Sequence, residues 1–229
     1  EVMKKLWAAS GAIDHQGKHY SVTQAIEPKP LQRPHPPFFL GGGSEYALEI
    51  SAKHSTVHLF WGDKPEVIAE KIGDIRERAA KYGRRDDIQF GMRLQIICEE
   101  TEEAAWDAAY RLIAGSTKFE IANSRLGAGA VEGVRKTSEA NRRVWELLEE
   151  SGDEMKIHPH LWTGISTVRT GAGIAVVGTP KQVADTLDEF VTAGCTSFCL
   201  SGYPHAEAAR GFSTKVMPYF KGRLSEGLP

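Results

Sequence analysis

Apolar residues recur along most of this chain at two spacings that alternate. Short apolar runs have the length and the β-branched or aromatic content of strands, and they cover residues 38–40, 57–60, 88–98, 175–178 and 196–200. The segments between them carry apolar residues at helical spacing, as in 65–83, where Val67, Ile68, Ile72 and Ile75 form one stripe. Strands that alternate with amphipathic helices predict βα units around a parallel sheet.

Several element boundaries are marked by capping residues. Thr179, Pro180 and Gln182 form a capping-box pattern, which predicts a helix start, and Gly194 ends that helix. Glycines 41–43 and Ser44 form a turn before a predicted helix, in which Tyr46, Leu48 and Ile50 are interpreted as apolar positions at helical spacing. A further helix is predicted to begin near Thr101, and Tyr203-Pro204 opens the last one.

The first and middle parts of the chain depart from this alternation. Residues 1–9 read as an amphipathic helix without a capping residue, so we expect a further segment upstream. A hairpin is predicted around Gly17, followed by an extended proline-rich connector over 28–37. Residues 115–170 are expected to form an insertion that contains a mobile loop and a surface helix with Val144, Trp145 and Leu148.

The strand count sets the predicted fold class. Four or five strands are visible where a closed (β/α)8 barrel has eight strands and about 250 residues. We therefore predict an α/β protein, the later strands of a TIM barrel, as a single partial domain over residues 1–229 with the insertion at 115–170.

Composition excludes several classes of function. Lys and Arg number 28 against 30 Asp and Glu, a net charge of −2, which argues against nucleic acid as a partner. No apolar run approaches the roughly 20 residues that cross a membrane, and no signal peptide is visible. Cys98, Cys195 and Cys199 form no CxxC pair, so we expect three buried, reduced thiols and a cytoplasmic location. His158 and His160 have no partners at metal-ligand spacing, and no metal site is predicted.

The strand at 88–98 carries the most informative polar residues. Because side chains alternate along a strand, Arg93 and Gln95 share a face with Gly91 and Ile97. That face either meets solvent, or Arg93 pairs with a structural carboxylate, or the guanidinium lies in a barrel lumen and binds an anion.

Four other places are candidates for chemistry. Gly42, Gly43 and Ser44 present amides at a helix start, which favours a phosphate, although glycine turns are also common as plain structure. Arg169 lies in a glycine-flanked stretch typical of a closing loop, or it is an exposed loop residue. Trp61 and Tyr203 follow strands, where barrel enzymes place functional groups, and packing is the alternative for both.

The segments FFLGGGSE, FGMRLQIICEETEEAAW, VRTGAG and SGYPHAEAA resemble the bacterial luciferase-like flavin monooxygenases, and among them the two-component alkanesulfonate monooxygenases. The resemblance implies a TIM barrel that uses reduced FMN (FMNH2), supplied by a separate NAD(P)H-dependent flavin reductase, together with O2. It implies cleavage of a small organosulfur substrate to an aldehyde and sulfite, and association into a homo-oligomer.

The resemblance also assigns roles to individual residues. Arg93 matches an active-site arginine, Arg169 the arginine of the mobile loop and Tyr203 a tyrosine near the flavin, so these three are the expected catalytic residues. Trp61 matches an active-site tryptophan, and it is grouped with Gln95 and His205 as substrate-binding. Gly42, Gly43 and Ser44 are the expected cofactor-binding turn.

Two departures from the family pattern keep alternatives open. Gln95 stands where the family has a histidine, so a neutral substrate or a deazaflavin cofactor on the same scaffold is the first alternative. The family's earlier strands, with a catalytic cysteine and histidine, have no counterpart here, and we expect a complete active site only with an upstream segment. A non-catalytic flavin-binding partial barrel is the second alternative.

Overall fold

The computed structural model describes residues 1–114, 138–168 and 171–220. Within the chain two compact units form, Glu1–Phe38 and Phe39–Pro229, and each is described by itself. Whether these units belong to one partial barrel domain stays a prediction.

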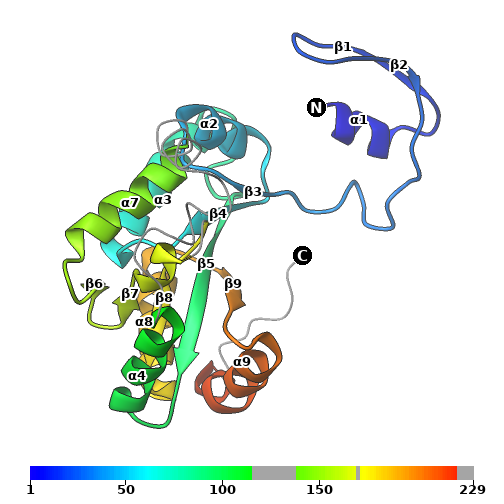
Figure 1. Ribbon diagram of the computed structural model, residues 1–229. Coiled ribbons are helices and arrows are strands. Elements are labelled where there is room, and N and C mark those ends of the chain that lie inside the picture. Colours follow the sequence, from blue (N-terminus) through cyan, green and yellow to red (C-terminus); the bar gives the residue numbers. More distant parts are fainter. Residues whose placement is uncertain (115–137, 169–170, 221–229) are drawn as a thin grey trace. The chain divides into compact units, whose positions relative to one another are not determined.

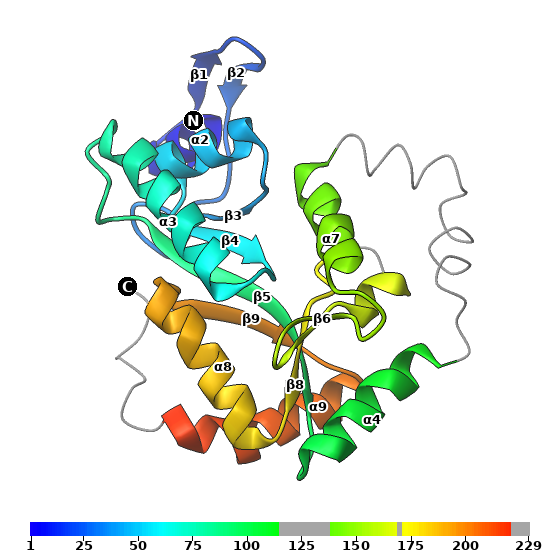
Figure 2. The same cartoon turned by 90° about the vertical axis from the view of Figure 1, so that its left-hand side faces the viewer.

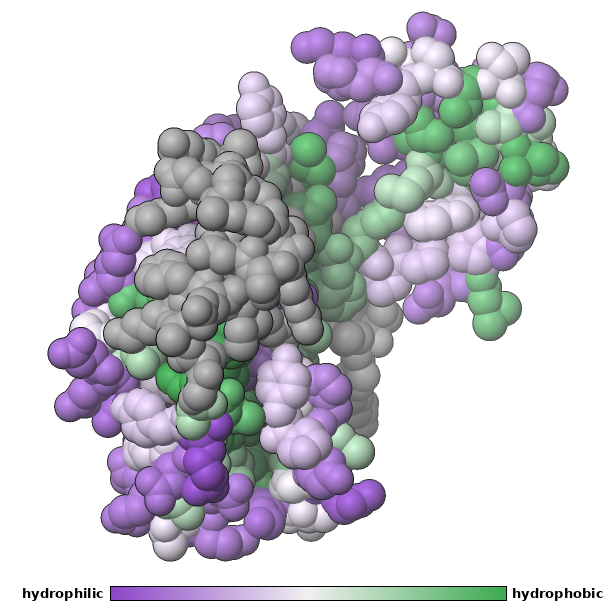
Figure 3. All heavy atoms as spheres, in the orientation of Figure 1, coloured by the Kyte–Doolittle hydropathy of each residue, from purple (hydrophilic) through white to green (hydrophobic). Residues whose placement is uncertain are grey.

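The first unit contains the predicted helix and hairpin. Helix α1 (Val2–Ala8) is followed by the antiparallel strands β1 (Ile13–Gln16) and β2 (Ser21–Ala25). The described connector over 26–37 has neither helix nor strand, as its prolines predict. Apolar side chains remain at the surface of this unit (Figure 3), among them the exposed Met3, Ile26 and Leu31. A two-stranded hairpin with so little buried surface is marginally stable alone.

The second unit holds the predicted alternation of strands and helices (Figure 1). Its elements in chain order are β3 (Phe39–Gly41), α2 (Glu45–His54), β4 (Val57–Trp61), α3 (Pro65–Ala80), β5 (Gln89–Cys98), α4 (Glu102–Ile113), α7 (Glu139–Glu150), β6 (Lys156–His158), β7 (Leu161–Trp162), a 3₁₀ turn (Gly164–Thr167), β8 (Ala175–Gly178), α8 (Pro180–Ala193), β9 (Ser197–Ser201), α9 (His205–Gly211), a π-helical turn (Phe212–Val216) and a 3₁₀ turn (Met217–Phe220). The predicted capping box of α8 is present, and Gly194 ends that helix in the left-handed conformation.

One curved sheet connects these elements (Figure 2). Its described strands run in the order β3-β4-β5-β8-β7-β6, and β9 also pairs with β5. Strands β3, β4, β5, β8 and β9 pair in parallel, whereas β6 and β7 are antiparallel. The parallel strands and their helices form part of a barrel, as the strand count predicts.

The main core lies on one face of β5. Most of its residues come from α3, β5 and α8, and these include Ile68, Ile72, Ile75, Phe90, Met92, Leu94, Ile96, Val183, Leu187 and Phe190. A smaller cluster joins Ile97 on the opposite face of β5 to Ala105 and Ala109 of α4 and to Trp162. The predicted alternation of β5 is therefore confirmed.

Three details of the sequence prediction are wrong. Tyr46 and Ile50 are exposed, and α2 buries Ser51 and Ala52 instead, because positions two residues apart lie on nearly opposite sides of a helix. Of the three thiols predicted to be buried, only Cys195 is: Cys98 is half-buried, and Cys199 is exposed because it lies on the face of β9 opposite to the core residues. The insertion contributes strands β6 and β7 to the sheet, which their short sequences did not reveal.

Candidate functional site

Strand register brings two of the predicted site residues together. Arg93 in β5 pairs with Trp61 at the end of β4 and with Cys199 in β9. Residues paired in register on neighbouring strands project to the same side of a sheet, and Arg93 alternates with the core residues Met92 and Leu94. Trp61, Arg93 and Cys199 thus form one row across three strands, which we call the Arg93 row.

Cys199 was not predicted to belong to this row. Its position could have been found from the sequence only by combining the alternation of β9 with the strand register. Register depends on which strands become neighbours, and the local pattern does not specify that.

Arg93 is half-buried. Among the described residues no carboxylate pairs with it, so the structural ion pair considered from the sequence is not seen there. A partly buried guanidinium without a carboxylate favours an external anion, and its planar fork matches the oxygens of a sulfonate or phosphate.

Gln95 lies one step further along the same face and is fully buried. Ser201 Oγ donates a hydrogen bond of 2.9 Å to Gln95 Oε1. Gln95 Nε2 donates to the carbonyl oxygen of Ala172 at 3.4 Å, and the Gln95 backbone N–H donates to the carbonyl of Ile174. The side chain therefore connects β5 with β9 and with the segment before β8.

Tyr203 and His205 follow directly after β9, where a parallel barrel places functional groups. Their rings lie 4.9 Å apart between centroids, and His205 Nδ1 hydrogen-bonds the carbonyl of Gly202 at 2.7 Å. Gly202 has no room for a side chain, because a Cβ would come within 2.7 Å of the Ile96 carbonyl oxygen. The close approach of β5 fixes the start of this loop.

The glycine turn lines a cavity of about 460 Å³. Gly42, Gly43 and Trp61 all contribute to its wall, and the first turn of α7 closes another side. Ser44 does not line it, because its Oγ caps α2 by accepting the N–H of Ala47 at 3.3 Å. Binding of a phosphate by Gly42, Gly43 and Ser44 stays a prediction.

A buried charged cluster lies beside this cavity, and the sequence did not single it out. The Asp63 carboxylate, 1% exposed, accepts hydrogen bonds of 2.9 Å from Nε and Nη2 of Arg143 and 2.8 Å from Lys71. Burial by itself would raise the pKa of Asp63, but hydrogen bonds from Arg143 and Lys71 lower that pKa below its usual range. The cluster fastens α7 to the end of β4, eighty residues away in the sequence.

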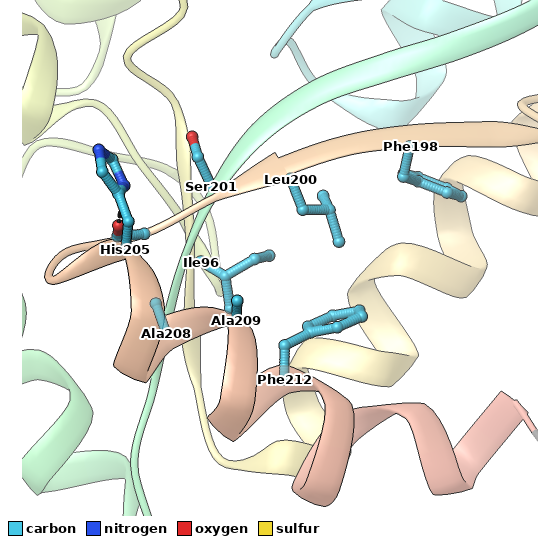
Figure 4. Close-up of a pocket in the computed structure, with 9 residues that line it drawn as sticks. Ile96, Phe198, Leu200, Ser201, His205, Ala208, Ala209 and Phe212 are labelled. Carbon is cyan, nitrogen blue, oxygen red and sulfur yellow. Dashed lines mark hydrogen bonds between the residues drawn. The ribbon is translucent and has the colours of Figure 1, made fainter.

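A second cavity, of about 580 Å³, lies between α9 and the strands β5 and β9. Figure 4 shows Ile96, Leu200, Phe198 and Phe212 turned toward one another around it. The Ser201 hydroxyl and the His205 ring point away from that apolar centre. His205 is thus directed toward the Tyr203 side of the loop.

Some expectations fall outside what the structure describes. Arg169 lies outside the described residues, as does most of the predicted mobile loop. In 1–114, 138–168 and 171–220, no three His, Cys, Asp or Glu side chains gather as a metal-binding group. The helices of the same ranges include none with the length and apolar content to span a membrane.

Comparisons with known proteins identify the scaffold. The profile of a family described as luciferase-like monooxygenase matches residues 1–197. Three solved structures superpose with a TM-score of 0.71: a riboflavin lyase with modified FMN and substrate riboflavin, at 20% identity; DmoA from Hyphomicrobium sulfonivorans, at 24%; and a long-chain alkane monooxygenase, at 23%.

The matches cover nearly all of this chain but little more than half of the others. Between 97% and 100% of this chain is aligned, against 55% of each of those three. A coenzyme F420-dependent tetrahydromethanopterin reductase from Methanopyrus kandleri also superposes, with a TM-score of 0.61 and 19% identity over 96% of this chain and 61% of its own. These structures share the fold.

Proposed function

We propose that this chain, which belongs to the luciferase-like monooxygenase family, carries part of the active site of an enzyme that uses reduced FMN and O2 to oxidise a small organosulfur compound. We propose an alkanesulfonate as the substrate, with an aldehyde and sulfite as products. The observation that carries the proposal is the Arg93 row, in which Arg93, without a carboxylate partner among the described residues, is paired in register with Trp61.

The residues of this row fit both a flavin and a sulfonate. The planar indole of Trp61 offers an apolar surface to an aromatic ring, and the Arg93 guanidinium offers two parallel N–H donors to an anion. Reduced FMN, when bound, supplies the electrons that activate O2.

The chain's own residues then have distinct roles. Arg93 binds and orients the sulfonate, and the Tyr203 hydroxyl donates a hydrogen bond to negative charge that develops near it. Arg169 supplies a second guanidinium, and His205 lines the site beside Tyr203. The amides of Gly42 and Gly43, with Ser44 at the start of α2, hold the phosphate end of the cofactor.

The proposal implies partners. Reduced flavin reacts with O2 in solution, so an NAD(P)H-dependent flavin reductase must deliver it. We also propose a homo-oligomer in the cytoplasm, the compartment that suits three thiols without a disulfide.

A deazaflavin-dependent oxidoreductase of a neutral substrate is the second candidate. It is favoured by the superposition on the F420-dependent reductase and by Gln95, which does not titrate. A non-catalytic flavin-binding partial barrel is the third candidate, because the chain spans 55% of each of the three solved structures described above.

Cofactor titration separates these candidates. Tryptophan fluorescence is followed during anaerobic addition of reduced FMN, oxidised FMN or F420 to the native chain and to Arg93→Ala. Arg85→Ala is the control, because Arg85 is an exposed arginine on the protein surface. Preferential binding of reduced FMN supports the monooxygenase, and preferential binding of F420 supports the second candidate.

The substrate class is tested with reduced FMN, O2, a flavin reductase and a panel of sulfonates. Sulfite release that is lost in Arg93→Ala and kept in Arg85→Ala supports the proposal. Tight binding of reduced FMN by the full-length protein that contains this chain, without sulfite release from any sulfonate, would remove the substrate class and leave the flavin site.

A further inference from the structure

Gln95 occupies the junction of three strands. It pairs in register with Ser201 of β9 and with Ala175 of β8. Among the described pairings, it is the one residue of β5 that pairs with both β8 and β9. Its side chain is completely buried at this junction. The hydrogen bonds of the Gln95 side chain are therefore made in a buried position, away from solvent.

The two ends of its amide bind different parts of the chain. Oε1 accepts the hydroxyl of Ser201 at 2.9 Å, and Nε2 donates to the carbonyl of Ala172 at 3.4 Å. A buried polar group that loses its partner is strongly disfavoured, so both contacts resist opening. The amide joins the end of β9 to residues 171–174.

The Ser201 contact leads directly to the loop with Tyr203. Gly202 is wedged between Ile96 and Ala208, where a Cβ would lie 2.7 Å from either, and its carbonyl accepts the hydrogen bond from His205. With Ser201 held and Gly202 confined, the backbone has little freedom before Tyr203. The Gln95–Ser201 bond thus holds the chain two residues before Tyr203, at the point where the loop begins.

The Ala172 contact fixes the other segment. Gly173 packs so closely on Ser166 that a Cβ there would overlap the Ser166 side chain. Ala172 and Ile174 bind the side chain and backbone of Gln95, respectively. Residues 172–174 therefore lie between the Ser166 turn and β5, and contacts on both sides restrict their conformation.

We infer that Gln95 is a positioning residue, whose amide bridges Ser201 and Ala172 and so sets the geometry of the Tyr203 loop relative to the Arg93 row. The sequence had suggested that Gln95 contacts substrate. A glutamine suits the bridge because one side chain supplies an acceptor and a donor, whereas glutamate lacks the donor and leucine lacks both. The inference rests on the proposed function only for its effect on catalysis.

The first test is hydrogen exchange, which needs no activity. Gln95→Leu keeps the size and removes both hydrogen bonds, while Ser201→Ala removes only one. Thr186→Val is the matched control, since it deletes a buried hydroxyl on α8 that binds the Gln182 carbonyl. Exchange in Gln95→Leu should rise by about tenfold in both 172–174 and 202–205, and in Ser201→Ala in 202–205 alone.

The second test is kinetic and uses non-additivity. If Gln95 acts through Ser201, the double variant resembles Gln95→Leu instead of multiplying the two losses. The turnover number kcat should fall by about tenfold while KM for the sulfonate stays near the native value, and Ser201→Thr should restore activity lost in Ser201→Ala.

Two results would overturn the inference. One is a rise of KM alone with unchanged exchange at 172–174 and 202–205, which would make Gln95 a direct substrate contact. The other is unchanged exchange at both segments in a folded Gln95→Leu variant, which has lost both hydrogen bonds, whatever its kinetic constants. An absence of sulfite release by the full-length protein that contains this chain would refute the proposed function, and hydrogen exchange would still decide the role of Gln95.

Discussion

Burial of a titratable imidazole makes the stability of the second unit depend on pH. His58 in β4 is 1% exposed, its Nδ1 lies 2.9 Å from Ser51 Oγ, and its ring meets the Phe60 ring edge-on at 4.6 Å. Burial, with a smaller contribution from the positive charge of Lys71, lowers the pKa of His58 from 6.5 to about 4. The folded protein therefore holds this histidine in the neutral form.

The sign of the effect follows from proton binding. Between pH 6.5 and about 4 the unfolded chain binds a proton at His58 and the folded chain does not, so stability falls as the pH is lowered through this range. At about 1.4 kcal/mol per pKa unit, the whole shift corresponds to about 3 kcal/mol. This contribution is fully present above pH 6.5 and is lost near pH 4.

Urea unfolding at a series of pH values measures this contribution. The free energy of unfolding of the native chain should fall from pH 7 to pH 4 by about 3 kcal/mol more than that of His58→Leu. The exposed His19 provides the control, because His19→Gln should follow the native curve. Equal pH dependence of the native chain and His58→Leu would refute the buried neutral histidine.

Three further substitutions test the packing around the candidate site, each by urea unfolding at pH 7. Asp63→Asn should lower the free energy of unfolding by about 3 kcal/mol, the lower end of the range for a broken buried ion pair, because Arg143 retains some contact with water. A variant as stable as the native chain would contradict the structural role of the cluster. Thr179→Ala should cost about 1 kcal/mol by removing the α8 cap, and Thr179→Ser should restore most of it. Gly62→Ala should destabilise by about 1–3 kcal/mol, because its Cβ would overlap Ile174; a neutral result would show that Ile174 can move aside.

Local patterns predicted most of the secondary structure. The spacing of Ile68, Ile72 and Ile75 fixes the buried side of α3, and Thr179 with Gln182 fixes the start of α8. The error in α2 came from residues two positions apart, a spacing that belongs to strands. Strands β6 and β7 are too short to carry a detectable alternation. They are stabilised by pairing with each other and by the pairing of β7 with β8.

Local patterns also predicted part of the candidate site. Alternation along β5 is enough to place Arg93 and Gln95 on one face, and strand ends mark Trp61 and Tyr203. The bridge from Gln95 to Ser201 joins residues that lie 106 positions apart. No local pattern specifies such a contact.

The βα alternation, the helix caps and the side on which each strand residue projects can be predicted from local sequence, because they depend on neighbours within a few positions. The tertiary structure alone decided that Trp61, Arg93 and Cys199 form one row and that Arg143 covers Asp63. It also decided that Gln95 holds two distant segments. Those arrangements depend on strand register and on which helices pack together, and both are settled by burial of the whole core rather than by any one segment.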